Sequence, residues 1–450
     1  MNKIFLAIVL TAFGVTAWRE WGWLAEEPDQ LSPMTLLGAN MIETAGTSVT
    51  LALGLVGIMA LFLGLMKIAE AGGLLTIIAR TIRPLMTRLF PDVPHDHPAM
   101  GAMVLNFSAN ALGLGNAATP FGIRAMQELD KLNPHKGTAT NAMVMFLVIN
   151  TASITILPTS VVAIRAAAGS SDAAAIVPTT LFATIVATAV AIICCRLLQR
   201  FWSTPTTSDA PEPRATITSA EAGFPEGATA NTAAVMHTAP IDESAGYPAW
   251  VSWLVLVGIV ALIPLMILFG RTISPWVIPG FMAVIMIFGL FRKVQVYEAF
   301  VEGAKDGFRV AVRIIPYLVA ILVAIGMLRT SGALDAMIDM IAPMTASFGL
   351  PAEALPMALM RSLSGSGAYG IMASIINDPM IGPDSYVGLL VSTIQGSSET
   401  TFYVLAVYCG AVGVRRMRHA VACGLIADAA AVLAAVLICT LLFANGIEML

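Results

Sequence analysis

Long apolar runs separated by short polar segments dominate this sequence. A membrane-spanning helix needs about 20 mostly apolar residues, and nine runs approach or exceed that length. These runs are residues 3–18, 48–66, 141–164, 176–198, 250–268, 274–291, 310–328, 387–410 and 420–443. The pattern predicts an all-α polytopic membrane protein in which these runs are the spanning helices.

The first run has two interpretations. Residues 1–17 have a short positive start and end on small residues before Trp18, a pattern that also fits a signal peptide. Because the sequence begins at Met1, we favour a retained helix. In either case the residues after this run are expected outside the cell.

Two further apolar segments are interrupted by polar residues and helix breakers. They are residues 98–121, with Asn106, Ser108, Asn110, Gly113, Gly115, Asn116, Thr119 and Pro120, and residues 355–376, with Pro356, Arg361, Ser362, Ser364, Gly365, Ser366, Gly367 and Gly370. Non-helical backbone is tolerated at membrane depth only when protein buries it or it lines a water-filled cavity. We therefore expect two re-entrant helical hairpins. The alternative is two ordinary helices that pack through small residues.

Composition narrows the class of protein. Apolar residues make up 57% of the chain and charged residues only 12%, with a mean hydropathy of +0.82. These values exclude a soluble enzyme, a nucleic-acid binder and a disordered chain. The exception is the segment 199–246, which is rich in Thr, Pro, Ala, Gly and Ser and is expected to be a flexible cytoplasmic linker.

The segments on either side of this linker repeat the same order of features. Each has a span, an amphipathic segment, an interrupted hairpin, a span with a polar centre and a final span. Matched pairs include Glu43 with Glu302, Gly73 with Gly332, Pro84 with Pro343, Pro98 with Pro356, Ser108 with Ser366, Asn150 with Gln395, Ser153 with Ser398 and Thr155 with Thr400. We therefore divide the chain into a first repeat (1–198), the linker (199–246) and a second repeat (247–450).

Positive charges switch ends between the two repeats. Lys and Arg concentrate on the cytoplasmic side of membrane proteins. In the first repeat they follow the first span, the hairpin and the last span (Arg80, Arg83, Arg88, Arg124, Lys131, Lys136, Arg196 and Arg200). In the second they precede the first and last spans (Arg292, Lys293, Lys305, Arg309, Arg313, Arg415, Arg416 and Arg418). The repeats are thus predicted to be inverted, with the N-terminus in the cytoplasm and the C-terminus outside.

Inverted repeats with paired broken segments are the layout of many secondary transporters, whose site lies near the membrane midplane. The spans after each hairpin have polar centres, around residues 150–155 and 395–400. Together with the hairpins they supply the candidate residues for binding a solute or ion: Asn106, Ser108, Asn110, Asn116, Asn150, Thr151, Ser153, Ser364, Ser366, Gln395, Ser398, Glu399 and Thr400. The alternative is that these groups serve only to hold the helices together by hydrogen bonds between them.

Glu399 is the acid that we expect to be most deeply placed in an apolar span. An ionisable group inside the membrane is costly and is a functional hypothesis by default. Glu399 would bind a cation, carry a proton or hold a basic substrate group. The alternative is a structural ion pair with Arg361. The first repeat has Ile154 at the matching position, so the site is expected to be asymmetric.

Other chemistry is not favoured. Residues 365–370 match a GxGxxG pattern, but no strand precedes them, so a dinucleotide site is not expected. The five cysteines show no metal-binding spacing, and the sequence contains no P-loop, nucleophile elbow or HExxH motif. We expect neither enzymatic activity, a resident cofactor nor a metal; a coupling ion such as Na⁺ or H⁺ is compatible with the pattern.

Several long motifs resemble a known family. Residues 105–122 (LNFSANALGLGNAATPFG) and 149–159 (INTASITILPT) resemble spore-maturation protein A, whereas residues 355–368 (LPMALMRSLSGSGA) and 395–408 (QGSSETTFYVLAVY) resemble spore-maturation protein B. The chain is thus similar to a fusion of the two. The resemblance implies that each repeat is a nucleoside recognition, or Gate, domain, a domain shared with concentrative nucleoside transporters and with the membrane part of ferrous-iron transporters.

These observations lead to one main expectation. The protein is expected to be a secondary transporter of a small polar solute in the bacterial inner membrane, with the lipid bilayer and the solute as its partners and no nucleic acid. A homo-oligomer is compatible with the sequence. The alternatives are a non-transporting scaffold or regulator of cell-envelope or spore-cortex maturation, an intramembrane enzyme acting on a lipid-linked precursor, and a channel.

Overall fold

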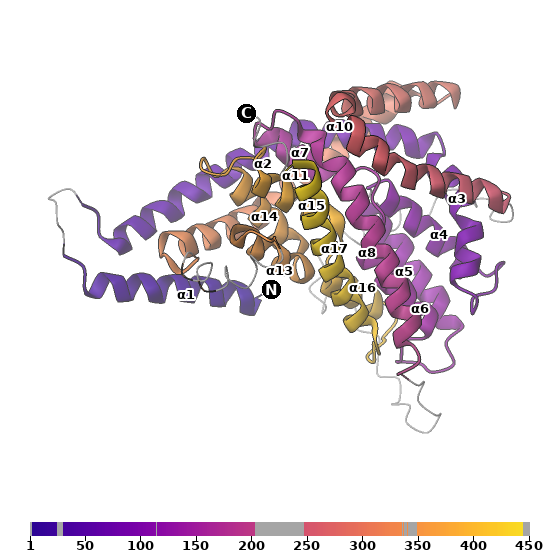
Figure 1. The fold of residues 1–450 in the computed structure, drawn as a ribbon, viewed down its shortest axis with the longest axis horizontal. Coiled ribbons are helices and arrows are strands. Elements are labelled where there is room, and N and C mark those ends of the chain that lie inside the picture. The colour runs from indigo at the N-terminus through magenta and orange to yellow at the C-terminus, as the bar shows by residue number, and fades with distance from the viewer. Residues whose placement is uncertain are drawn as a thin grey trace.

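The computed structural model describes residues 2–24, 30–113, 115–202, 247–334, 336, 340 and 349–443. Within these residues every regular element is helical, apart from one isolated β-bridge between Thr138 and Arg416. The predicted all-α class is therefore confirmed (Figure 1). Most of the predicted linker, residues 203–246, lies outside the described residues.

The helices follow the order that the repeat predicts. The first repeat comprises α1 (Asn2–Trp21), α2 (Pro33–Ala71), α3 (Leu74–Leu89), α4 (Pro98–Ala111), α5 (Gly115–Lys131), α6 (Asn141–Thr151), α7 (Thr159–Ala167), the short 3₁₀ helix η1 (Ala173–Ile176) and α8 (Val177–Leu198). The second comprises α10 (Ala249–Phe291), α11 (Val296–Thr330), η2 (Ala352–Ala354), α13 (Leu355–Leu363), α14 (Gly365–Ile376), α15 (Tyr386–Ser397), α16 (Thr401–Gly410) and α17 (Ala420–Phe443). Thus α4–α5 corresponds to α13–α14, the broken helix α6–α7 to α15–α16, and α8 to α17.

The long helices α2 and α11 are equivalent and run antiparallel. The start of α11 packs against the end of α2, where Gly303 meets Leu63, and its end packs near the start of α2, where Gly326 meets Asn40. A Cβ atom on Gly303 would lie 2.4 Å from the backbone oxygen of Leu63, so the helices approach too closely there for any larger residue. Small residues permit this kind of close crossing between membrane helices.

The equivalent final helices α8 and α17 are also antiparallel. Thr179 at the start of α8 and Cys439 near the end of α17 both contact Thr393, at 2.8 and 3.4 Å between their side-chain atoms. At the opposite ends, Cys195 of α8 lies next to Cys423 of α17. Because matching helices of the two repeats run in opposite directions, the inverted-repeat architecture is confirmed.

Fewer helices of the described residues meet the length and hydropathy criteria for a membrane span than the nine apolar runs predict. Among the described residues, two helical segments are long and apolar enough to span a membrane by length and composition, Ala173–Leu198 and Ala420–Phe443. A third arises if the pair Val56–Ala71 and Leu74–Leu89, bent by 69°, counts as one broken span. The total of nine crossings stays a prediction.

Two predicted spans, 250–268 and 274–291, both lie in α10, which Figure 1 shows as two arms that meet at a sharp bend. Both ends of α10 contact the corner between α2 and α3. The Ser252 hydroxyl donates to the Thr81 carbonyl at 2.6 Å, and Arg292, just after α10, donates to the Gly72 carbonyl at 2.7 Å.

The core is shared between the repeats. One apolar cluster surrounds the α4–α5 hairpin and contains Phe107 and Phe146 of the first repeat together with Tyr408 of the second, with neighbouring ring centroids 5.4 and 5.9 Å apart. A second cluster surrounds the α13–α14 hairpin and includes Val162 of α7 and Leu390 of α15. The repeats therefore interleave, with α6 beside α16 and α7 beside α15 (Figure 1).

Candidate functional site

The two broken helices meet at their breaks. The first is interrupted between Thr151 and Thr159, and the second between Ser397 and Thr401. The backbone N–H of Glu399 donates to the carbonyl oxygen of Thr151 at 2.7 Å, which joins the two interruptions directly. A Cβ atom on Gly396 would lie 3.2 Å from the Pro158 side chain, so the end of α15 packs closely on the first break. The fold thus brings together the two polar centres that the sequence places 245 residues apart.

The tip of the first hairpin docks on the first break through neutral groups. The amide nitrogen of Asn110 donates to the side-chain oxygen of Asn150 at 3.0 Å, and the N–H of Ile156 donates to the carbonyl of Ala111 at 3.0 Å. Gly113 turns the chain at the tip with a φ of +74°, and a Cβ atom there would lie 2.5 Å from the Leu157 oxygen. Only glycine fits both this conformation and this contact.

The second hairpin docks on the second break through charge. Arg361, near the end of α13, is only 5% exposed. Its guanidinium lies 3.7 Å from the carboxylate of Glu399 and donates to the hydroxyl of Thr400 at 3.3 Å. After the turn, the hydroxyl of Ser364 caps α14 by accepting from the N–H of Gly367 at 3.1 Å. The geometry therefore places Arg361, which the sequence proposed as a structural partner of Glu399, within ion-pair distance.

The most deeply buried acid of this region is Asp428 in α17, which the sequence reading missed. Asp428 is 5% exposed, whereas 48% of the Glu399 side chain is exposed, so Asp428 is the more buried of the two acids. The hydroxyl of Thr401 donates to one carboxylate oxygen of Asp428 at 2.7 Å. The hydroxyls of Ser362 and Ser398 face the same carboxyl group. One acid in a 24-residue apolar helix was the signal that could have identified it.

Several buried polar atoms here have no hydrogen-bond partner among the described residues. Both amide atoms of Gln395 are unpaired, although this residue is only 1% exposed. The other unpaired atoms are the side-chain oxygen of Asn106, Oδ1 of Asp428 and Nε of Arg361. Buried polar groups are nearly always satisfied, so such exceptions call for a water, an ion or a ligand as the missing partner.

Other predicted site residues form hydrogen bonds within one helix or between neighbouring helices. The Ser108 hydroxyl donates to the Val104 carbonyl of its own helix, and the Thr151 hydroxyl to the Val148 carbonyl. Asn106 donates to the Ala118 carbonyl at 2.8 Å and to the Tyr408 hydroxyl at 3.3 Å. Ser153 is buried in the first break. The side chains of Asn116 and Ser366 lie outside the described part of the chain.

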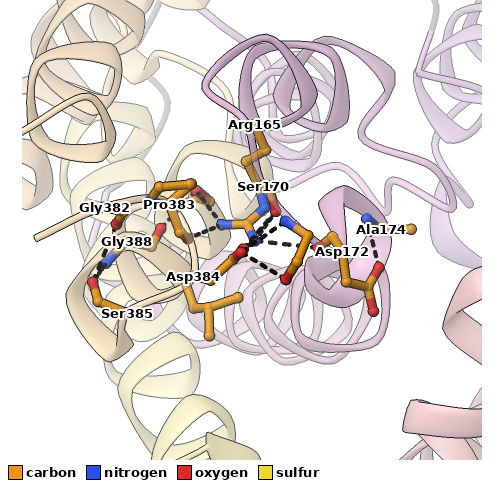
Figure 2. Close-up of polar contacts among 12 residues, drawn as sticks. Arg165, Ser170, Asp172, Ala174, Gly382, Pro383, Asp384, Ser385 and Gly388 are labelled. Carbon is orange, nitrogen blue, oxygen red and sulfur yellow. Dashed lines mark hydrogen bonds and ion pairs between the residues drawn. The ribbon is translucent and has the colours of Figure 1, made fainter. Parts of the chain in front are cut away.

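A second polar cluster, also missed from the sequence, joins the repeats at one end of the molecule (Figure 2). Arg165, near the end of α7, is fully buried and forms an ion pair with Asp384 at 3.0 Å. It also donates to the Pro383 carbonyl at 2.6 Å, while Ser170 and Ser171 donate to Asp384. Burial raises the pKa of Asp384, but these hydrogen bonds and the charge of Arg165 outweigh it, so the pKa lies below its usual range. We call this group the Arg165 end contact.

The repeat symmetry places an equivalent contact at the other end. There the loop before α6 meets the loop before α17, where Arg415 N–H donates to the Gly137 carbonyl at 2.9 Å and Ala139 N–H to the Arg416 carbonyl at 3.0 Å. Arg418 donates to the side-chain oxygen of Asn141 at 2.8 Å. This Arg418 end contact consists mainly of backbone hydrogen bonds and contains no ion pair among the described residues.

Metal ligands do not gather in the described residues: no three His, Cys, Asp or Glu side chains lie close enough together to hold a metal ion. The chemistry that the site offers instead is hydrogen bonding by amides and hydroxyls around one guanidinium and two carboxylates.

Comparison with known proteins places this geometry in context. The family model for nucleoside recognition, named Gate, matches residues 52–168 and 311–415. The chain is similar to spore maturation protein B of Bacillus subtilis (48% identity over 169 residues, 38% of this chain and 94% of that protein). It is also similar to spore maturation protein A of the same organism (47% over 153 residues, 34% of this chain and 78% of that protein). A shorter stretch of 82 residues is 36% identical to the Escherichia coli inner membrane protein YjiG, covering 18% of this chain and 54% of that protein.

Among solved structures, the chain has a similarity to the YdaH transporter of Alcanivorax borkumensis, with a TM-score of 0.35 and 16% identity over 98% of both chains.

Proposed function

Because this chain belongs to the family of spore maturation proteins A and B, with a Gate domain in each repeat, we propose that it is a secondary transporter of a small polar solute and not an enzyme. The observation that carries this proposal is the meeting of two helical hairpins and two broken helices from antiparallel repeats around buried polar atoms that have no hydrogen-bond partner within the described part of the chain. Transporters bind their cargo at such helix interruptions, where backbone and side-chain groups are free to bind it.

The solute would bind at the two interruptions. The unpaired amide of Gln395 offers a donor and an acceptor, and the Arg361–Glu399 pair offers charge beside it. Asn110, Asn150, Ser398 and Thr400 would complete the polar surface, with the other predicted residues holding the helices in place. Motion of the hairpins against the remaining helices would expose this site alternately on each side of the membrane.

The same proposal includes the membrane in which the protein lies, its orientation there and the bounds of its repeats. The inner-membrane name of the relative YjiG supports a place in the bacterial inner membrane. We propose a cytoplasmic N-terminus and an external C-terminus, from the charge pattern, with repeats at 1–198 and 247–450 joined by a cytoplasmic linker. A homo-oligomer is compatible with the exposed apolar surface of the outer helices, and no resident cofactor is proposed.

The first test is to identify the solute and then to measure its uptake. Mass spectrometry of molecules retained by the purified protein, with thermal-shift competition, would supply the solute for uptake into proteoliposomes. Glu399→Gln is expected to lower uptake at least tenfold while the protein stays folded, because it removes the partner of Arg361 at the break. The matched control is Glu353→Gln, an exposed acid of the same repeat, which is expected to transport like the wild type. Equal uptake by both variants would remove Glu399 from the mechanism.

A second candidate function follows from the names of the relatives. The similarity to spore maturation proteins A and B also fits a second function for this chain, that of a non-transporting scaffold or regulator of cell-envelope or spore-cortex maturation. A scaffold would use the buried polar residues only for packing. Substitutions at the break would then change stability and maturation in parallel, and no solute would be retained or transported.

A further inference from the structure

Three charged side chains converge beside the second break. Arg361 comes from the second hairpin, Glu399 from the break itself and Asp428 from α17. The carboxylate of Glu399 is 3.7 Å from Arg361, and the positive charge of Arg361 also acts on Asp428. When all three are ionised the cluster carries a net charge of −1, so one negative charge is left without a counter-charge.

Exposure decides which acid bears the excess charge. Glu399 has 48% of its side chain exposed and is the acid within ion-pair distance of Arg361, so both solvent and the guanidinium stabilise its charge. Asp428 is 5% exposed; Thr401 donates to one of its carboxylate oxygens at 2.7 Å, the Ser362 and Ser398 hydroxyls face the group, and Oδ1 has no partner at hydrogen-bond distance among the described residues. A buried carboxylate without full compensation costs several kcal/mol. Asp428 is thus the group that would gain most from an added positive charge.

We propose that Asp428 takes up the coupling ion of this transporter and that this ion is a proton, bound at Oδ1. The inference rests on the proposed transport function, which supplies the reason for taking up and releasing an ion. The step is a simple protonation: a proton from water adds to a lone pair of Oδ1, and the carboxylate becomes a neutral carboxylic acid. No bond of the protein breaks and no electron is transferred.

The surroundings favour a proton over a metal cation. A hard cation needs about six oxygen ligands, and the guanidinium of Arg361 close by would repel it. A proton needs only the free oxygen of Asp428 and one acceptor for the resulting O–H. The hydroxyls of Ser362 and Ser398 face the carboxyl group and favour its ionised form by donating to it; because a hydroxyl can also accept, the same groups would take the hydrogen bond of the protonated acid.

The other helices that pack on α17 bring few competing titratable groups. These are α6, α8, α13, α15 and α16. From α13 comes Arg361, and from the break between α15 and α16 comes Glu399. Helices α6 and α15 contain no Asp, Glu, Lys, Arg, His or Cys, although α15 begins with Tyr386. Helix α16 contributes Tyr403, Tyr408 and Cys409. Helix α8 contributes Cys194, Cys195 and Arg196 near its end. Asp428 and Glu399 are the acids of this region whose protonation would change the charge around Arg361.

Protonation would connect α17 to the second hairpin. With Asp428 neutral, Glu399, which lies 3.7 Å from Arg361, would be the negative charge of the cluster that attracts the guanidinium. With Asp428 ionised, the guanidinium is drawn toward α17 as well, and its hold on Glu399 and Thr400 weakens. One proton would therefore change how the hairpin docks on the break that we propose to bind the solute.

Infrared difference spectroscopy of the purified protein in lipid nanodiscs tests the proton site without a known solute. A pH titration is expected to show the carbonyl stretch of a protonated carboxylic acid, which disappears in Asp428→Asn and remains in Glu399→Gln. Asp428→Glu should keep a shifted band, which guards against a loss caused by misfolding. Replacing choline chloride with sodium chloride at constant ionic strength should leave the band unchanged. A band that Asp428→Asn retains, or that sodium removes, would overturn the proposal.

Uptake measurements then separate this inference from the proposed function. A pH gradient should drive solute uptake by the wild type. Asp428→Asn should reduce this driven uptake at least tenfold but should still exchange solute when its concentration is equal on both sides. If Asp428 titrates but no solute is transported, the transport function fails. If transport is found but Asp428→Asn remains driven by the pH gradient, the proton inference fails.

Discussion

In the first repeat, the hairpin is held to its broken helix by a neutral amide pair, Asn110 and Asn150, 3.0 Å apart. In the second repeat, the equivalent contact is ionic, through Arg361 and Glu399. The sequence alignment explains the exchange. At the shift that matches Pro98 with Pro356, Arg361 takes the place of Met103, which is fully buried in the apolar core.

The alignment also explains why Gln395 has no partner. Gln395 corresponds to Asn150, but the residue that corresponds to Asn110 is Ala368, which offers no polar side chain. The second repeat has therefore kept an amide at the break and lost the asparagine that pairs with it in the first repeat, and the hydroxyl of Tyr369 faces Gln395 instead. Inverted repeats preserve the backbone arrangement, and the side chains are then free to differ. Because Asn110 and Asn150 bond to each other, we infer that the first break contributes less to solute binding than the second break does.

The two end contacts differ in the same way. The Arg165 end contact buries a complete guanidinium, whereas the Arg418 end contact relies on backbone hydrogen bonds with a partly exposed arginine. We therefore expect the two end contacts to differ in how much they stabilise the folded protein and in how that stability depends on pH.

The largest expected effect is on the Arg165 end contact. Arg165→Ala should lower the free energy of unfolding by about 3 kcal/mol, because it leaves Asp384 and the Pro383 carbonyl without their partner. Arg418→Ala at the other end should cost about 1 kcal/mol, since backbone hydrogen bonds remain. Thermal unfolding of both variants in the same detergent measures the difference. Equal shifts in Tm would show that the two ends are energetically alike.

The next prediction separates structure from binding at the two breaks. Asn150→Leu should destabilise the protein by about 2 kcal/mol, because the amide of Asn110 loses its acceptor in a buried setting. Gln395→Leu should cost no stability, since it removes an amide that is already unpaired, but it should abolish retention of the bound solute. The readouts are Tm and ligand retention by mass spectrometry. A large loss of stability in Gln395→Leu would assign it to packing and contradict the contrast.

Much of this architecture follows from the sequence because it depends on local features. Apolar runs, helix breakers and the shift of positive charges predict the hairpins, the broken helices and their inversion. Glu399 and Arg361 were identifiable because each interrupts an apolar segment. The Arg165–Asp384 pair was not, since it joins residues 219 apart at helix ends where charge is ordinary. Asp428 also interrupts an apolar run, so its presence was readable, but its neighbours were not, because they depend on how α16 approaches α17 at Gly424, where a Cβ atom would lie 2.7 Å from Thr401.

The smallest expected effect is the acid sensitivity of the Arg165 end contact. The pKa of Asp384 is lower in the folded protein than in the unfolded chain, so its contribution to stability is complete above the unfolded value of about 3.9 and is lost as the pH falls toward the folded value. The side chain is 41% exposed, so solvent screening keeps this contribution small. The Arg418 end contact has no acid in residues 137–140 or 415–418 and should not change over this range. Asp384→Asn should therefore lower the Tm at neutral pH and flatten the fall of Tm with acid. If wild type and Asp384→Asn lost stability in parallel between about pH 5 and pH 3, the acid sensitivity would arise elsewhere, and the two ends would differ in strength but not in their response to protons.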